Sequence, residues 1–275
     1  MLTDTQVESW LVEDVGHHDA TDDVPGEARG LLVAREAGVA AGLDAARAVF
    51  DYLGVDAEPQ VEEGDRVGAG DAVLAVEGPA RDVLRGERAA VNVAAHASGI
   101  ATRTREAVDA ARAASAAVRI ACTRKTTPGL RGVEKRAVAA GGGDTHRLDL
   151  SHAAMVKDNH VAALGLERAV ERVRDRVSFA TTVIAEVERP ADGPRAAAAG
   201  ADAVLFDNLP PAAVERGVER LPAGVLAEAS GGIALADVPA YAATGVDVIS
   251  MGSLTHSAPA LDYSFRVECT AERDG

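Results

Sequence analysis

The stretch VIAEVERPADGPRAAAAGADAVLFDN, residues 183–208, holds two short apolar runs joined by an alanine-rich segment. The runs VIAEV (183–187) and AVLF (203–206) are hydrophobic almost throughout, which is typical of parallel strands that are buried on both faces. Parallel neighbours need a crossover long enough to hold a helix, and the joining segment has the composition of one. This strand–helix–strand unit predicts an α/β fold.

The same unit recurs on either side of this stretch. Further apolar runs occur at VRIAC (118–122), AAMV (153–156), VLAEAS (225–230) and VDVISMG (246–252), with helical patterns between most of them. Buried parallel strands that alternate with helices are typical of an α/β barrel. We therefore predict a TIM-like barrel domain, complete or incomplete, over residues 106–265.

A polar or glycine-rich segment follows each predicted strand. Barrel enzymes carry their active sites at the carboxyl ends of the strands, so these segments should converge on one mouth. Polar residues also end strands for no functional reason, but several ends with complementary chemistry favour a shared site. In chain order, the segments are Arg124-Lys125, Lys157-Asp158-Asn159-His160, Glu186 with Glu188, Asp207-Asn208, Ser230-Gly231-Gly232 and Gly252-Ser253.

The predicted mouth has an acidic half, with Glu186 and Asp207, and a cationic half. Guanidinium groups match carboxylates and phosphates with two parallel hydrogen bonds, and ammonium groups act as point charges. The chain has only three lysines, and two of them belong to the cationic half, which indicates an anionic ligand. The cationic half consists of Arg124, Lys125, His146, Arg147 and Lys157.

Two glycine turns predict a second kind of anion site. SGGI (230–233) and MGSLTHS (251–257) each follow a strand and precede a helical stretch, so backbone N–H groups and a helix N-terminus could hold a phosphate. Late strands of α/β barrels often carry phosphate sites. An ordinary capping role explains His256 equally well. The predicted contacts are Ser230, Gly231, Gly232, Gly252, Ser253 and His256.

Residues 1–105 have a different pattern, which predicts a separate α+β sandwich domain. In VEEGDRVGAGDAVLAVEG (61–78), short Val and Leu runs alternate with Gly-Asp turns, as in compact antiparallel β structure. Carrier domains that attach biotin or lipoate to a lysine have a similar pattern, but the first lysine here is Lys125. A long alanine-rich helix follows, with an interruption expected at Ser98-Gly99. Residues 266–275 form a tail that could pack on this domain.

The composition of the chain excludes several classes of partner. A net charge of −15 opposes binding to nucleic acid or anionic membranes. The apolar runs are too short to span a membrane and MLTDTQVESW lacks the features of a signal peptide, which together indicate a cytoplasmic protein. The acidic balance and the scarcity of lysine fit adaptation to a salty cytoplasm, and codon bias in a GC-rich genome is the alternative.

One family shares the motifs TRKTTPGLR (123–131), GGGDTHRLDLSHAAMVKDNH (141–160), AEVE (185–188), LFDN (205–208), EASGGI (228–233) and VDVISMGSLTHSAPALDYSF (246–265). The family with these motifs is nicotinate-nucleotide pyrophosphorylase, also called quinolinate phosphoribosyltransferase. The chain resembles this family over almost its whole length. LVEDVGHHDAT (11–21) and GERAAVN (86–92) extend the resemblance. The chain departs from the family at Gly16-His17-His18-Asp19, where many members have Gly-x-Gly-Asp, and at Thr145, where asparagine is frequent.

The resemblance implies transfer of phosphoribose from phosphoribosyl pyrophosphate to the ring nitrogen of quinolinate. Pyrophosphate and CO2 leave, and nicotinate mononucleotide is made for de novo NAD biosynthesis. By motif, Arg124, His146, Arg147 and Lys157 would bind the quinolinate carboxylates, Lys125 would lie between quinolinate and the sugar phosphate, and the SGG and GS turns would hold the 5′-phosphate.

The resemblance also implies the remaining roles. Lys125, Lys157, Glu186 and Asp207 would be the catalytic residues, with both acids near the ribose and the pyrophosphate. Mg²⁺ would arrive bound to that pyrophosphate and have no direct protein ligand. Arg88 would reach quinolinate in the neighbouring chain of a homodimer or higher even oligomer, whereas the simpler interpretation makes it a surface residue.

Two other functions compete. Lys157 at a strand end could form a Schiff base in a lyase, but this leaves the His146-Arg147 pair unexplained. A paralogue associated with molybdenum transport has the same fold and would handle a ligand without turnover. The complete cationic set argues against that paralogue.

Overall fold

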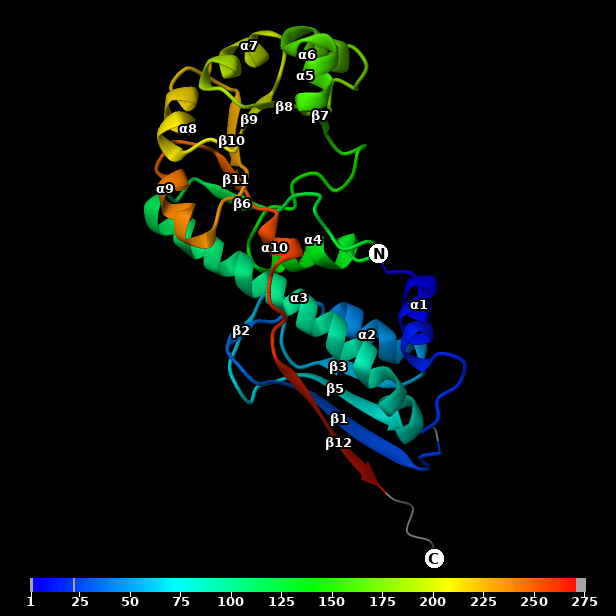
Figure 1. Ribbon diagram of the computed structural model, residues 1–275. Coiled ribbons are helices and arrows are strands. Elements are labelled where there is room, and N and C mark those ends of the chain that lie inside the picture. The colour runs from blue at the N-terminus through cyan, green and yellow to red at the C-terminus, as the bar shows by residue number, and fades with distance from the viewer. Residues whose placement is uncertain (1, 22, 271–275) are drawn as a thin grey trace, which may run out of the picture. The chain divides into compact units, whose positions relative to one another are not determined.

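The computed structural model describes residues 2–21 and 23–270, which fall into two compact units (Figure 1). The first boundary falls after Arg105, but two later segments that the sequence assigned to the barrel domain, 126–142 and 258–265, group with the N-terminal part. Unit 1 comprises Met1–Arg105, Thr126–Gly142 and Ala258–Gly275, and unit 2 comprises Glu106–Lys125 and Gly143–Ser257.

Unit 1 is built on an antiparallel sheet in the order β12-β1-β5-β3, and β2 pairs separately with β4. The antiparallel structure expected over residues 61–78 is therefore confirmed. The outer strand β12 explains why residues 258–265 belong here, because it pairs with β1 along its whole length. The elements are α1 (Asp4–Val15), β1 (Glu27–Ala34), β2 (Gly38–Val39), α2 (Leu43–Tyr52), β3 (Asp56–Pro59), β4 (Arg66–Val67), β5 (Ala72–Pro79), α4 (Arg131–Ala140) and β12 (Tyr263–Thr270).

The core of unit 1 lies between the sheet and its helices. Burial alternates along the first part of β1, as expected for a sheet with one covered face. Leu32 on β1, Leu74 on β5 and Phe50 on α2 are almost completely buried. The Phe50 ring stacks on Phe265 of β12 with a centroid separation of 5.9 Å, which ties α2 to the outer strand.

Helix α3 (Ala80–Ala114) is continuous, so the interruption predicted at Ser98-Gly99 is wrong. A Cβ atom at Gly99 would lie 2.0 Å from the carbonyl oxygen of Pro259. The Ser98 hydroxyl is buried and donates to the carbonyl of Ala41 at 3.0 Å. The Ser-Gly pair thus permits close packing of the helix against neighbouring backbone. In the sequence alone, a Ser-Gly pair with this role looks the same as one that breaks a helix.

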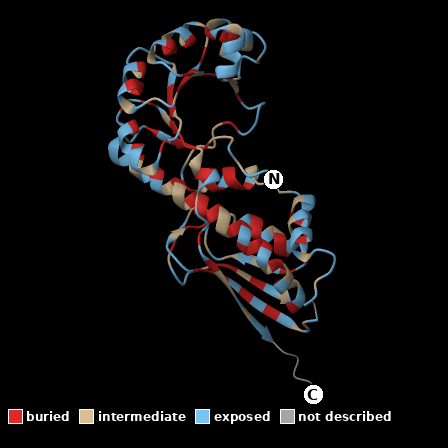
Figure 2. Cartoon of the chain, in the orientation of Figure 1, coloured by how far each residue is buried: buried red, intermediate tan, exposed pale blue. Residues whose placement is uncertain are grey.

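Unit 2 contains the six predicted strands in one parallel sheet, in the order β6-β11-β10-β9-β8-β7. Figure 2 shows the buried strands with helices outside them. Since β6 and β7 end the order, the barrel stays open within the described residues. The elements are β6 (Arg119–Ala121), β7 (Ala154–Val156), α5 (Asp158–Leu164), α6 (Leu166–Arg174), β8 (Val183–Val187), η1 (Pro190–Asp192), α7 (Gly193–Ala198), β9 (Ala203–Asp207), α8 (Pro211–Val218), β10 (Leu226–Ser230), η2 (Leu235–Asp237), α9 (Val238–Ala242), β11 (Val248–Ser250) and α10 (Ser253–His256).

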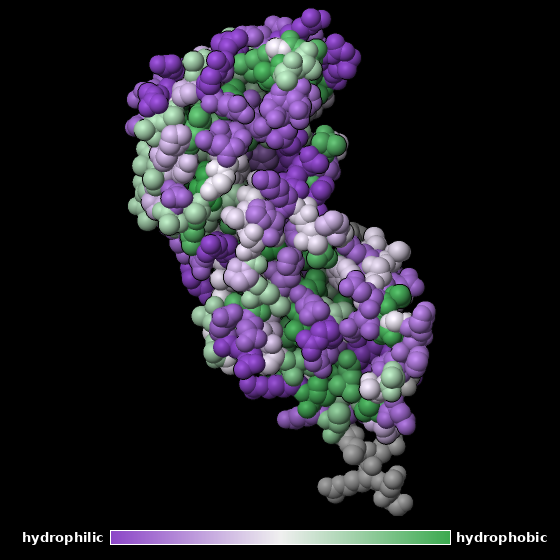
Figure 3. Space-filling model, viewed as in Figure 1, coloured by the Kyte–Doolittle hydropathy of each residue, from purple (hydrophilic) through white to green (hydrophobic). Residues whose placement is uncertain are grey.

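Hydrophilic side chains cover most of the face shown in Figure 3. Within residues 2–21 and 23–270, no helix has both the length and the apolar character needed to cross a membrane.

Candidate active site

A cavity of about 420 Å³ opens at the carboxyl ends of the unit 2 strands. Most of the residues that the sequence predicts for the site line this cavity, because parallel strands bring their carboxyl ends to the same edge of the sheet. The predicted residues that line it are Arg124, Lys125, His146, Arg147, Lys157, Glu186, Asp207, Ser230, Gly231, Gly232 and Gly252.

Arg147 is the most deeply buried cation of the site, with 8% of its surface exposed. Its guanidinium donates to the carbonyl of Ala153 at 3.4 Å and contacts the Met155 sulfur at 3.3 Å. Burial lowers the pKa of Arg147 and the neighbouring Arg124 lowers it further, while Glu228 and Glu186 act in the opposite direction. Two guanidinium groups held close in a partly desolvated cavity favour the entry of an anion.

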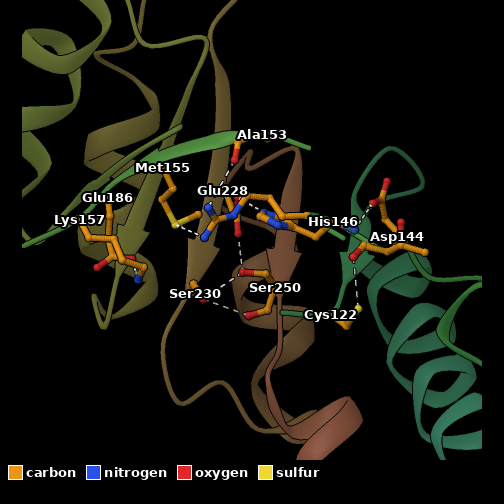
Figure 4. A network of polar contacts seen from close by, with 12 residues as sticks. Cys122, Asp144, His146, Ala153, Met155, Lys157, Glu186, Glu228, Ser230 and Ser250 are labelled. Atoms are coloured by element: carbon orange, nitrogen blue, oxygen red, sulfur yellow. Dashed lines mark hydrogen bonds and ion pairs between the residues drawn. The ribbon is translucent and has the colours of Figure 1, made fainter. Parts of the chain in front are cut away.

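Lys157 extends from the end of β7 to Glu186 on β8, and the ammonium nitrogen lies 2.6 Å from the carboxylate. The two side chains approach each other in Figure 4. A lysine that is charged and paired in this way is a poor nucleophile, because Schiff-base formation needs a neutral amine. The contact therefore argues against the lyase alternative.

A buried polar network crosses the site between neighbouring strands (Figure 4). Glu228 on β10 is 4% exposed, and its carboxylate lies 3.0 Å from His146 Nε2 and 2.5 Å from Ser250 Oγ. Ser250 Oγ is also 2.9 Å from Ser230 Oγ. The network thus connects the cationic half of the site to the glycine turn that begins at Ser230.

The turn after β10 requires glycine at position 231. Gly231 has φ of 95°, and a Cβ there would lie 2.4 Å from Oδ1 of Asn208. Asn208 is itself left-handed, with φ of 54°, and its amide donates to Asp207 at 2.6 Å. The Ser230–Gly232 turn therefore lines the cavity beside Asp207, which lines it as well.

Both glycine turns are followed by the helical stretch that the sequence predicts, but each stretch begins with a short helix. SGGI leads into the three-residue η2, and MGSLTHS leads into the four-residue α10. Helices of this length have little macrodipole, so an anion would depend on the N–H groups of the turns themselves.

Three predicted site residues do not line the cavity. Ser253 and His256 lie on α10, where His256 is exposed and its Nδ1 is 2.5 Å from the Ser257 hydroxyl. Arg88 belongs to α3 in unit 1, is exposed, and contacts its neighbour Glu87 at 3.7 Å.

Sequence reasoning missed several residues that line the cavity. Glu228, Ser250 and Met155 lie inside strands, whereas the prediction favoured polar residues at or near the ends of the apolar runs. The available signal was a charged residue within the apolar run VLAEAS, because a buried carboxylate in a strand needs partners. Thr123 also lines the cavity, and its hydroxyl accepts from the Lys125 backbone N–H at 3.1 Å.

The acidic side chains of the cavity suit Mg²⁺ by their chemistry, since that ion prefers oxygen ligands. Among residues 2–21 and 23–270, however, no group of three or more His, Cys, Asp or Glu side chains could hold a metal ion. A magnesium ion here would need further oxygen ligands from a bound phosphate compound.

Comparisons with known proteins match both parts of the chain. The family model described as quinolinate phosphoribosyl transferase, C-terminal domain, matches residues 100–266, and that of the N-terminal domain matches residues 18–98. A probable carboxylating nicotinate-nucleotide pyrophosphorylase of Methanothermobacter thermautotrophicus is 46% identical over 95% of this chain and 97% of its own length. The carboxylating nicotinate-nucleotide pyrophosphorylase of Homo sapiens is 42% identical over 95% and 90%. The crystal structure of NadC from Streptococcus pyogenes has a TM-score of 0.91 and 38% identity, over 98% of this chain and 99% of that one.

Proposed function

The chain belongs to the quinolinate phosphoribosyltransferase family, and we propose that it transfers phosphoribose from phosphoribosyl pyrophosphate to the ring nitrogen of quinolinate. Pyrophosphate and CO2 leave, and nicotinate mononucleotide is the product for NAD biosynthesis. The observation that carries this proposal is a cavity lined by two arginines, two lysines and a histidine in a protein of net charge −15. Such a local reversal of charge suits polyanionic substrates, and both of these are polyanions.

The quinolinate carboxylates would bind to Arg124, His146, Arg147 and Lys157. Arginine forks can hold each carboxylate with two charge-assisted hydrogen bonds, which fixes the plane of the pyridine ring. Lys125 would lie between the ring and the sugar phosphate, where its compact charge can serve both. The Ser230–Gly232 turn and Gly252 would bind the 5′-phosphate, with their backbone N–H groups as hydrogen-bond donors.

Glu186 and Asp207 would face the ribose. As the bond from C1 to pyrophosphate loosens, positive charge develops on the sugar ring, and two fixed carboxylates stabilise that charge. When Mg²⁺ is bound with phosphoribosyl pyrophosphate, it supplies charge neutralisation for the departing pyrophosphate.

Positioning and charge provide the catalysis, without an organic cofactor. Holding the ring nitrogen in line with C1 can lower the barrier by several kcal/mol. The nitrogen lone pair forms the new bond to C1 and becomes a pyridinium. That cation then accepts the electron pair left when the adjacent carboxylate departs as CO2, and a proton replaces the carboxylate on the ring.

The proposal is tested with purified protein, quinolinate, phosphoribosyl pyrophosphate and Mg²⁺ in high salt. Nicotinate mononucleotide, pyrophosphate and CO2 should appear in equal amounts. A folded protein that binds quinolinate without turnover would instead support the transport-associated paralogue.

We further propose that the enzyme is a cytoplasmic homodimer and that Arg88 completes the partner's site. The exposed position of Arg88 on α3 supports this. Arg88→Ala would then damage the partner's site and Lys157→Ala its own, so each homodimer should be inactive. After subunit exchange half the dimers are mixed, each with one intact site of two, so about a quarter of wild-type activity should return. No recovery, with exchange verified by mass spectrometry of tagged chains, would rule out a shared site.

Adaptation to salt is proposed from the net charge of −15. Self-repulsion among surface carboxylates destabilises the folded state at low ionic strength, and molar KCl screens it over a few ångströms. The melting temperature should therefore rise steeply between dilute buffer and molar KCl. A flat curve would favour codon bias in a GC-rich genome.

A further inference from the structure

The buried carboxylate of Glu228 has a place in the site that the proposed roles leave unexplained. It lies on β10 between His146 and Ser250, with one oxygen directed to each (Figure 4). The backbone of His146 is also fixed, because it is left-handed at φ of 50° and its backbone N–H donates to Asp144 at 2.6 Å.

The direction of each hydrogen bond follows from the donors and acceptors available. An ionised carboxylate only accepts, so His146 Nε2 must carry a hydrogen in its 3.0 Å contact with Glu228. The single Ser250 hydroxyl hydrogen must likewise point to Glu228, at 2.5 Å. Ser230 Oγ lies 2.9 Å from Ser250 Oγ, and its own hydroxyl donates to the backbone carbonyl of Ser250 at 3.3 Å. Glu228 thus determines which atoms of the network carry hydrogens.

This arrangement has a consequence for His146. Neutral imidazole carries one N–H, and Glu228 already fixes it on Nε2, so the remaining nitrogen would be an acceptor. An acceptor repels a substrate carboxylate. Nδ1 can donate to an anion only when the ring is an imidazolium with both nitrogens protonated.

We propose that Glu228 is a positioning residue that commits His146 to bind a substrate carboxylate as a cation, so that quinolinate binding takes up a proton. The inference rests on the proposed function, because it takes quinolinate as the ligand. The other charged groups that line the cavity are arginine, lysine and carboxylate side chains, which ordinarily keep their charge between about pH 6 and about pH 8.5, whereas histidine does not. Those groups are Arg124, Lys125, Arg147, Lys157, Glu186 and Asp207, and Asp144 contacts the His146 backbone.

Isothermal titration of quinolinate into the protein across that pH range tests the proposal, in buffers with different ionisation enthalpies. In the wild type, proton uptake should appear as a buffer-dependent heat. The affinity should fall by about tenfold per pH unit once the free histidine is neutral. In Glu228→Gln, the amide can donate to Nε2, so a neutral ring with hydrogen on Nδ1 can bind the carboxylate. The affinity of this variant for quinolinate should be lower than that of the wild type at about pH 6, and it should change less than about twofold across the pH range.

Two further variants separate this role from simple destabilisation. Glu134→Gln makes the same change at a fully buried glutamate in unit 1 that lies 2.9 Å from His96 Nε2, and it should keep the wild-type pH slope. Glu228→Asp keeps an acceptor-only carboxylate, so it should bind more weakly but retain the slope. Circular dichroism should show that each variant is folded.

A wild type that binds quinolinate with no pH slope, or a Glu228→Gln variant that keeps the slope, would overturn the inference. Formation of nicotinate mononucleotide alongside either result would leave the proposed function intact. A wild type that neither binds quinolinate nor forms product would overturn both.

Discussion

The Arg147→Ala variant should lose about 10²- to 10³-fold in kcat/KM for quinolinate while remaining folded. A buried, charge-assisted contact to a substrate carboxylate contributes about 2–5 kcal/mol, or about 30- to 4000-fold, and the expected loss lies in the middle of that range. The fold should survive, because removal of this guanidinium also removes its repulsion with Arg124. Steady-state kinetics and a thermal melt of the same preparation measure both properties.

The same loss is expected for Arg124→Ala and Lys157→Ala, and in the latter Glu186 also loses its ammonium partner. Arg147→Lys should recover only part of the activity, since lysine restores the charge but not the two-pronged geometry. Arg216→Ala is the matched control, because Arg216 is an exposed arginine on α8 outside the cavity. Unchanged turnover in any of the three alanine variants would remove that residue from the site.

Nicotinate should be used about 10⁴-fold less well than quinolinate in kcat/KM. It lacks the second carboxylate, so the cations that serve this carboxylate would stay desolvated and without an anion. Competition between the two acids, followed by quantification of nicotinate mononucleotide formed from isotopically distinct substrates, gives the ratio directly.

The alanine variants provide a control for this specificity. A variant that lacks a cation for the second carboxylate should lower kcat/KM for quinolinate but not for nicotinate. The ratio of the two kcat/KM values should therefore decrease. Comparable kcat/KM values for the two acids in the wild type would contradict the assignment of the cationic half to a dicarboxylate.

Local pattern was sufficient to predict the barrel strands and most of the residues that line the cavity. Continuous apolar runs identify buried parallel strands, and the topology of such sheets then brings Arg124, Lys157 and Asp207 to one edge. Glu228 was missed because its role depends on what the neighbouring strands place beside it. No feature of VLAEAS states that His146 and Ser250 will be its partners.

The division of the chain was harder to predict for a related reason. Residues 258–265 look like a continuation of the barrel, yet β12 pairs with β1, which is more than two hundred positions earlier in the chain. Gly99 shows the same limit, because glycine is needed there to make room for the backbone of Pro259, which is far away in the sequence. Such long-range pairings leave little trace in a short window of sequence.

The pairing of β1 with β12 also constrains how the protein is made. A ribosome adds residues from the N-terminus onward, so strands β1, β3 and β5 emerge long before residues 263–270. During that interval the hydrogen-bonding edge of β1 is uncovered, and an uncovered strand edge readily pairs with another chain. Unit 1 can therefore complete its sheet only after the residues of unit 2 have been synthesised.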